Sequence, residues 1–146
     1  MRLFLVAGAA VAATLVIPVT AVQASAAAVE FTKVQYDSPG DDTGSNRSLN
    51  KEWIKVTNRS NEKKTLTGWT LRAPQRHVFK FPEFKLGAGK TVTIHTGKGT
   101  DSKNDFYWRQ DGYVWNNEGD KTILKNASKK QVDVCKWGSG SGRAAC

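Results

Sequence analysis

Histidine and cysteine are scarce in this sequence. Each occurs twice in 146 residues, and neither an H-E-x-x-H pattern nor a G-x-S-x-G pattern is present. Those patterns place a metal-bound or nucleophilic site in many hydrolases. His77 and His95 lie on different expected strands, and we expect His95 to be an exposed strand residue beside Thr91 and Thr93. The sequence therefore predicts no catalytic residue, no cofactor and no metal ligand, and the protein is not expected to be an enzyme.

Apolar residues at helical spacing are missing after residue 26. Short runs rich in Val, Ile, Thr, Phe, Tyr and Trp recur instead, and each ends at Gly, Asn, Asp or Pro. Such runs are typical of strands in an antiparallel sandwich or barrel. The sequence thus predicts an all-β domain, with strands in residues 29–37, 52–56, 66–71, 79–82, 91–97, 106–108, 113–115, 121–124 and 131–135.

Charge is nearly absent from the first part of the chain. Arg2 is the only charged residue before Glu30, and residues 3–22 are apolar apart from two threonines and Pro18. A basic start, an apolar run and small residues around Ala26 predict a secretory signal peptide over residues 1–26, cleaved after Ala26 or Ala28. A transmembrane anchor is the alternative, but no basic stop-transfer flank follows the run. We therefore expect a secreted protein with no stable membrane anchor after cleavage, and a mature chain of about 120 residues, enough for one domain.

Acidic residues are outnumbered. Lys and Arg total 22 against 13 for Asp and Glu, so the formal net charge is +9. A basic surface favours polyanions such as nucleic acid or an anionic cell-envelope polymer. The lysines are scattered along the chain, however, and a merely solvated surface explains them better.

The two cysteines, Cys135 and Cys146, flank a Gly/Ser-rich tail. In an oxidising compartment such a pair predicts one disulfide that ties the tail of residues 138–146 back to the domain. Alternation in the last strand places Val132 and Val134 inward. Cys135 and Trp137 are then expected to face outward.

Two strand segments carry unusual patterns. In residues 29–37 the apolar phase slips by one residue near Thr32, and a β-bulge there brings four apolar residues to one face, namely Val29, Phe31, Val34 and Tyr36. In residues 52–56, Glu52 shares the inward phase with Ile54 and Val56. A buried carboxylate must find hydrogen-bond donors, so we expect Glu52 to accept from backbone N–H groups or to pair with a lysine.

Five tryptophans are many for a domain of this size. Trp69 is the first choice for the core, because Leu71 shares its phase. Trp108 lies beside Tyr107 and Arg109 at a loop edge, where an exposed indole near cations binds sugars or single-stranded nucleic acid by stacking. These three, Tyr107, Trp108 and Arg109, are the candidate ligand-binding residues. Acidic loops at residues 37–42 and 101–105 offer oxygen ligands for calcium, but ordinary turn chemistry accounts for them better.

Several short motifs in order resemble the lamin tail domain family, an immunoglobulin-like sandwich. They are Glu52-Trp53-Ile54-Lys55-Val56-Thr57-Asn58, Leu66-Thr67-Gly68-Trp69-Thr70-Leu71, Phe79-Lys80-Phe81-Pro82, Leu86-Gly87-Ala88-Gly89, Ile94-His95-Thr96-Gly97 and Trp115-Asn116-Asn117-Glu118-Gly119-Asp120. Ala88 departs from the family, which commonly has proline there. The resemblance implies an immunoglobulin-like β-sandwich over residues 29–137, without shared catalytic residues, that serves in binding or attachment.

The sequence as a whole thus predicts an exported, non-catalytic binding or attachment module. Its ligand, partner and oligomeric state are not determined by these patterns. A basic polyanion-binding protein, for nucleic acid or an anionic cell-envelope polymer, is the first alternative. A small secreted hydrolase and an envelope structural protein are the others.

Overall fold

Strands form in this chain where β-branched and aromatic residues recur between turn-forming residues. The computed structural model describes residues 27–146, so the expected signal peptide lies outside the described residues. Within that part, α1 (Asn46–Leu49) is a single helical turn, with the Ser45 side chain accepting a hydrogen bond from the Ser48 N–H. No helix of residues 27–146 has the length and apolar character to cross a bilayer.

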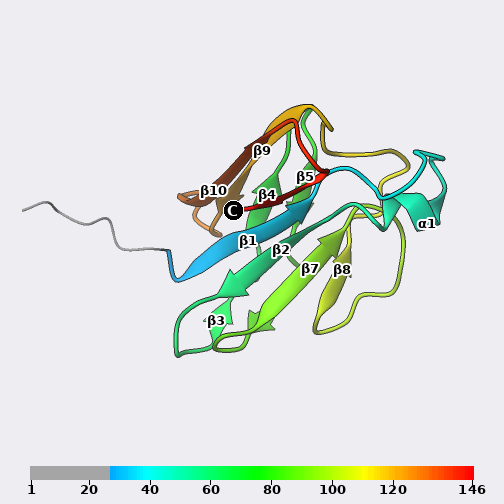
Figure 1. The fold of residues 1–146 in the computed structure, drawn as a ribbon. Helices are drawn as coiled ribbons and strands as arrows, with labels where there is room; N and C mark the ends of the chain where they lie inside the picture. Colours follow the sequence, from blue (N-terminus) through cyan, green and yellow to red (C-terminus); the bar gives the residue numbers. More distant parts are fainter. Residues whose placement is uncertain (1–26) are drawn as a thin grey trace, which may run out of the picture.

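Two main sheets pack against each other (Figure 1). The five-stranded sheet has the order β11 (Arg143–Ala145), β1 (Val29–Gln35), β2 (Trp53–Asn58), β7 (Thr91–His95) and β8 (Asp105–Tyr107). The four-stranded sheet has the order β10 (Gln131–Gly138), β9 (Gly119–Lys125), β4 (Thr70–Arg72) and β5 (Val78–Lys80). A two-stranded ribbon joins β3 (Lys64–Thr65) to β6 (Lys85–Leu86).

The core lies between these sheets. Leu71, Phe79 and Leu124 enter it from the four-stranded sheet, and Ile54 and Ile94 enter it from the five-stranded one. The expected antiparallel β-sandwich is confirmed, with one difference: β8 runs parallel to its neighbour β7. The chain reaches β8 through the loop of residues 96–104, which returns it to the start of β7.

The expected bulge in β1 is present. The pairing of β1 with β2 shifts between Phe31 and Lys33, and all four apolar residues of the run are buried. The Phe31 N–H donates to Asp133 Oδ2 of β10 at 2.7 Å, which ties the irregular point of one sheet to the other sheet. A polar side chain thereby satisfies a backbone donor beside the irregularity.

The last long strand is oriented opposite to the expectation. Cys135 and Trp137 are buried, whereas Val134 is 39% exposed. The pairing of β10 with β9 shifts between Gln131 and Asp133. This second irregularity changes the phase of the strand, so an alternation counted from Val132 assigns the wrong face to every later residue.

The tail is a strand. Residues Arg143–Ala145 form β11 on the open edge of β1, and the disulfide Cys135–Cys146 connects its end to the other sheet. The expected disulfide is thus formed. Further backbone bonds run from the Tyr36 and Asp37 N–H groups to the Gly142 carbonyl oxygen. The tail consequently covers a sheet edge that would otherwise be free.

Residues 113–115 are not the expected strand. The N–H groups of Val114 and Trp115 donate to Glu52 Oε1 at 2.9 and 2.7 Å, so the carboxyl group takes the place of a strand partner. Glu52 is completely buried, and its expected structural role is confirmed. Burial raises the pKa of Glu52 to about 8, against the opposing effect of the hydrogen bonds from Trp115 and Val114.

Three tryptophans, Trp108, Trp115 and Trp137, are buried in the core. Trp115 contacts both of the others edge to face, at ring-centroid distances of 5.8 and 5.4 Å. Trp69, the expected core residue, is only partly buried at the edge of the cluster. Trp108 was open to two interpretations, an exposed platform at a loop edge or packing in the core; at 8% exposed it packs in the core.

Candidate binding surface on the five-stranded sheet

Five side chains line up across the outer face of the five-stranded sheet. Strand pairing places Arg143 opposite Gln35, Gln35 opposite Trp53, Trp53 opposite His95, and His95 opposite Tyr107. Residues that are opposite each other project to the same side of a sheet. The residues next to this row along each strand, such as Ile54 and Ile94, are buried in the core. The side chains of the row therefore face away from the core. We call these five residues the transverse row.

A second row lies beside the first. In it Lys33 is opposite Lys55, Lys55 is opposite Thr93, and Thr93 is opposite Asp105. Like charges on directly opposed residues destabilise a sheet. Among residues 27–146, no carboxylate lies within ion-pair distance of either lysine, so their repulsion is not relieved inside the domain.

Trp53 lies between two of the cations. The Lys55 ammonium is 5.0 Å from the centroid of the Trp53 ring, and the Arg143 guanidinium carbon is 5.9 Å from it. Both distances allow cation–π attraction. Arg143 also donates from Nε to Gln35 Oε1 at 2.7 Å, a neutral acceptor that leaves its charge uncompensated. The centre of the face is therefore an aromatic ring with two cations close to it.

His95 is held in a network. Its Nε2 is 2.9 Å from Asp105 Oδ1, and its Nδ1 is 2.9 Å from the Asn50 carbonyl oxygen. The ring stacks on Tyr107 with a centroid distance of 5.0 Å. The side chain is only 19% exposed, so the expected exposed histidine is instead a partly buried, hydrogen-bonded one. Both ring nitrogens therefore lie within hydrogen-bond distance of oxygen atoms of the domain itself.

The three expected ligand-binding residues are distributed unevenly. Tyr107 belongs to the transverse row. Arg109 lies at its end, where it pairs with Asp101 at 3.1 Å and donates to the Tyr107 carbonyl oxygen. Trp108 points the other way, into the core, because it alternates with Tyr107. The indole therefore offers no exposed platform, and the binding role expected for Tyr107 and Arg109 stays a prediction.

Trp53, Lys55 and Arg143 are the surface residues that the search for sites in the sequence missed. Alternation with Ile54 and Val56 already places Trp53 and Lys55 outward, so a signal for them was present. No comparable signal existed for Arg143. Its place over Trp53 depends on the tail forming β11 beside β1.

The acidic loop of residues 101–105 is organised by turn chemistry. Asp101 Oδ1 accepts the Tyr107 N–H at 3.0 Å, and Ser102 Oγ accepts the N–H groups of Asn104 and Asp105. In the part of the chain that the structure describes, no three His, Cys, Asp or Glu side chains are grouped as metal ligands would be. Nothing in this loop favours calcium over the ordinary turn.

A comparison with protein families finds one match. The model of the Lamin Tail Domain matches residues 22–139, which include every strand from β1 to β10. β11 and Cys146 follow the matched residues. No curated protein matches the chain.

Proposed function

The chain belongs to the lamin tail domain family and has its immunoglobulin-like fold, and from this premise we propose that it is a non-catalytic binding module for anionic polymers. The outer face of the five-stranded sheet is the binding surface. Its ligand is a polymer with repeated negative charges, such as nucleic acid or an anionic cell-envelope polymer.

One observation carries the proposal. Three cations, Lys33, Lys55 and Arg143, lie on one face, two of them (Lys55 and Arg143) within cation–π distance of Trp53, and no carboxylate among residues 27–146 pairs with any of the three. Cations that repel one another in the free protein attract a polyanion more strongly, since its charges relieve the repulsion. A merely solvated surface does not need its charges around one aromatic ring.

A non-catalytic role is supported by His95. Its two nitrogens are occupied by Asp105 and Asn50, and no hydroxyl or thiol group is among its hydrogen-bond partners. A nucleophile and its base must lie within hydrogen-bond reach of each other. The His95–Asp105 pair therefore supports the packing of β7 on β8 rather than hydrolysis.

Export completes the proposal. The Cys135–Cys146 disulfide suits an oxidising compartment, which agrees with the signal peptide expected in residues 1–26. N-terminal sequencing of protein recovered from the medium checks this point: a chain that starts at Ala27 or Val29 is expected, and intact Met1 on exported protein contradicts it.

Binding is tested with a triple variant, K33Q/K55Q/R143Q. Fluorescence anisotropy measures its affinity for single-stranded DNA, RNA and a polyglycerol phosphate at several salt concentrations. We expect the dissociation constant of the wild type to rise steeply with salt, and the slope of log K against log salt to fall by up to about three in the variant.

The matched control is K80Q/K121Q/K136Q, which removes three positive charges from the four-stranded sheet instead. All three control lysines are exposed. Equal losses of affinity in the two triple variants mean that net charge alone matters and that the face is not the site. Affinity of the wild type that does not change with salt contradicts the proposal altogether.

A further inference from the structure

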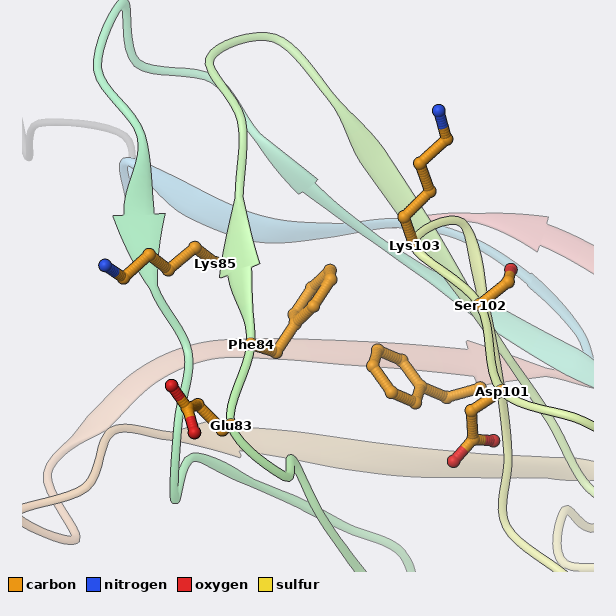
Figure 2. A pocket seen from close by; sticks show the side chains of 7 residues that line it. Glu83, Phe84, Lys85, Asp101, Ser102 and Lys103 are labelled. Atoms are coloured by element: carbon orange, nitrogen blue, oxygen red, sulfur yellow. The ribbon is translucent and has the colours of Figure 1, made fainter.

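A lysine-lined groove lies at the edge of the sandwich, and none of the five residues of the transverse row lines it. It consists of two hollows of about 590 and 410 Å³ that share Lys85 and Lys103 as walls. β6 and the turn after it form one bank, and the loop that leads into β8 forms the other. Figure 2 shows the larger hollow, with Phe84 between the two banks and Lys103 on the far one.

Charge in the smaller hollow is all of one sign. Lys85, Lys90 and Lys103 line it, and no carboxylate does. In the described part of the chain these three lysines form no ion pair, whereas Lys64 and Lys98 do. Of the two carboxylates in the larger hollow, Asp101 is already paired with Arg109. The groove is thus bordered by three lysines without ion pairs and by one free carboxylate, that of Glu83. Figure 2 shows the Lys85 and Lys103 side chains extending away from each other, so their ammonium groups must turn toward a shared ligand.

Both banks are held in place by hydrogen bonds. The Asn58 amide donates to the carbonyl oxygens of Leu86 and Gly87 at 3.0 and 3.1 Å, which fixes the turn before β7. On the other bank the Ser102 hydroxyl accepts two backbone N–H groups, and the Asn104 carbonyl oxygen accepts the Thr93 N–H. The lysine backbones are therefore positioned before any ligand arrives, which lowers the entropic cost of binding.

The Lys90 side chain passes close to Gly87. A Cβ atom on residue 87 would lie 3.1 Å from Lys90 Cγ, so the Lys90 stem would have to shift by a few tenths of an ångström. The absence of a side chain at Gly87 lets Lys90 lie along the turn beside the other two lysines.

The floor of the larger hollow is aromatic. The Phe84 and Phe106 rings meet edge to face at 4.9 Å, and Phe84 is only half-buried. An aromatic floor beside point charges suits a ligand with a C–H-rich ring and an attached anion. Lysine ammonium groups act as point charges and bind phosphate oxygens well.

From these features we infer that the groove between Lys85, Lys90 and Lys103 is a binding site for a sugar phosphate, with the phosphate on the lysines and the sugar ring on Phe84. The inference goes beyond the proposed function, since it concerns a different part of the surface and different residues. A phosphorylated polymer and a free sugar phosphate share this chemistry.

Chemical-shift titration of the disulfide-bonded chain of residues 27–146 tests the site with three probes: ribose 5-phosphate, inorganic phosphate and ribose. We expect ribose 5-phosphate to shift the amide signals of Gly87, Lys103 and Asn104. Inorganic phosphate is expected to bind at the same residues about tenfold more weakly, and ribose alone to produce no shift. A polyglycerol phosphate that shifts these signals indicates a polymeric source; shifts from ribose 5-phosphate alone indicate a free ligand.

Substitutions then separate the parts of the site. K90Q and K103Q are each expected to raise the dissociation constant of ribose 5-phosphate by about tenfold. K80Q removes one charge from the four-stranded sheet as the matched control, and it is expected to leave the dissociation constant of ribose 5-phosphate unchanged. F84L removes the Phe84 ring from the floor of the groove and is expected to weaken binding several-fold.

Two results overturn the inference. One is a shift pattern that maps to the transverse row and is lost in K55Q instead of K103Q. The other is equal binding of inorganic phosphate and ribose 5-phosphate together with an unaffected F84L variant, which contradicts a sugar site. Because K33Q/K55Q/R143Q leaves the groove intact, failure of polymer binding on the sheet face does not affect this test.

Discussion

The Trp115 N–H donates to the buried Glu52 carboxyl group across 63 positions of the sequence, at an N···O distance of 2.7 Å. The Val114 N–H donates to the same oxygen at 2.9 Å. A single side chain at the start of β2 therefore holds the segment that leads into β9. Two aromatic contacts of Trp115 in the core depend on this anchor.

Glu52 predicts an unusual dependence of stability on pH. Burial raises its pKa from 4.5 to about 8, so between these values the folded protein binds a proton that the unfolded chain releases. The contribution of Glu52 to the free energy of unfolding is fully present below about pH 4.5 and is lost as the pH rises through about 8. Urea unfolding at pH 5, 6.5 and 8 is expected to show that the free energy of unfolding decreases by up to a few kcal/mol as the pH rises.

The E52Q variant is the control for that effect, since glutamine retains an acceptor oxygen and does not titrate. We expect the free energy of unfolding of E52Q to lack the decrease between pH 5 and 8 that Glu52 causes in the wild type. E52A, which leaves the N–H groups of Val114 and Trp115 without an acceptor, is expected to lose about 2–4 kcal/mol relative to the wild type at pH 5 and less at pH 8, where the wild type has itself lost the Glu52 contribution. The same pH slope in the wild type and E52Q means that another group is responsible.

Asp133 is expected to stabilise the bulge of β1. Its Oδ2 accepts the Phe31 N–H at 2.7 Å, so D133A leaves a backbone donor beside the core without a partner. We expect D133A to lower the free energy of unfolding by about 1–3 kcal/mol. D133N, which retains an acceptor oxygen, is expected to lose less, as measured by denaturant titration; equal losses in the two variants show that the hydrogen bond is not the cause.

The disulfide is expected to stabilise both the domain and its basic face. Cys135 and Cys146 are 11 residues apart, and closing such a loop contributes about 3 kcal/mol in the chain-entropy model. The variant C135S/C146S is expected to lose about that amount. Amide hydrogen exchange is expected to show faster exchange in the variant at the N–H of residue 146, which in the wild type donates to the Thr32 carbonyl oxygen. Unchanged protection there contradicts a role of the disulfide in holding β11.

Trp53 provides a test of the sheet face that does not alter charge. W53A removes the ring that Lys55 and Arg143 contact, and we expect it to weaken polyanion binding several-fold. W53F retains an aromatic face and is expected to fall between W53A and the wild type in the same anisotropy assay. Wild-type affinity in W53A shows that the cations act without the ring.

Local patterns predicted much of this fold. The slip of the apolar phase at Thr32 identified the bulge of β1, and the inward phase of Glu52 identified a buried carboxyl group that needs donors. The spacing of Cys135 and Cys146 identified the disulfide. These features could be predicted because each depends on alternation along one strand or on the chemistry of a nearby pair.

The predictions from the sequence were wrong where a second strand irregularity, or a partner far away in the chain, decided which way a side chain faces or whether a segment forms a strand. The pairing shift between Gln131 and Asp133 reverses the faces of Val134 and Cys135, and nothing in the apolar pattern of β10 marks it. Residues 113–115 have strand composition, yet their N–H groups bind Glu52 instead of a strand. Trp108 faces the core because β8 pairs with β7 in a register that buries the neighbouring Phe106 as well as Trp108.

The amino-acid sequence by itself thus determined the all-β class, the family, the inward phase of most strands and the covalent closure of the tail. Tertiary structure alone decided which outward residues become neighbours. Arg143, Trp53 and Tyr107 meet on one face, and Lys85 and Lys103 meet across one groove, because strand order and register join segments that are far apart in the chain. Periodicity along a strand encodes which face a side chain takes; only the pairing of strands sets its neighbours across the sheet.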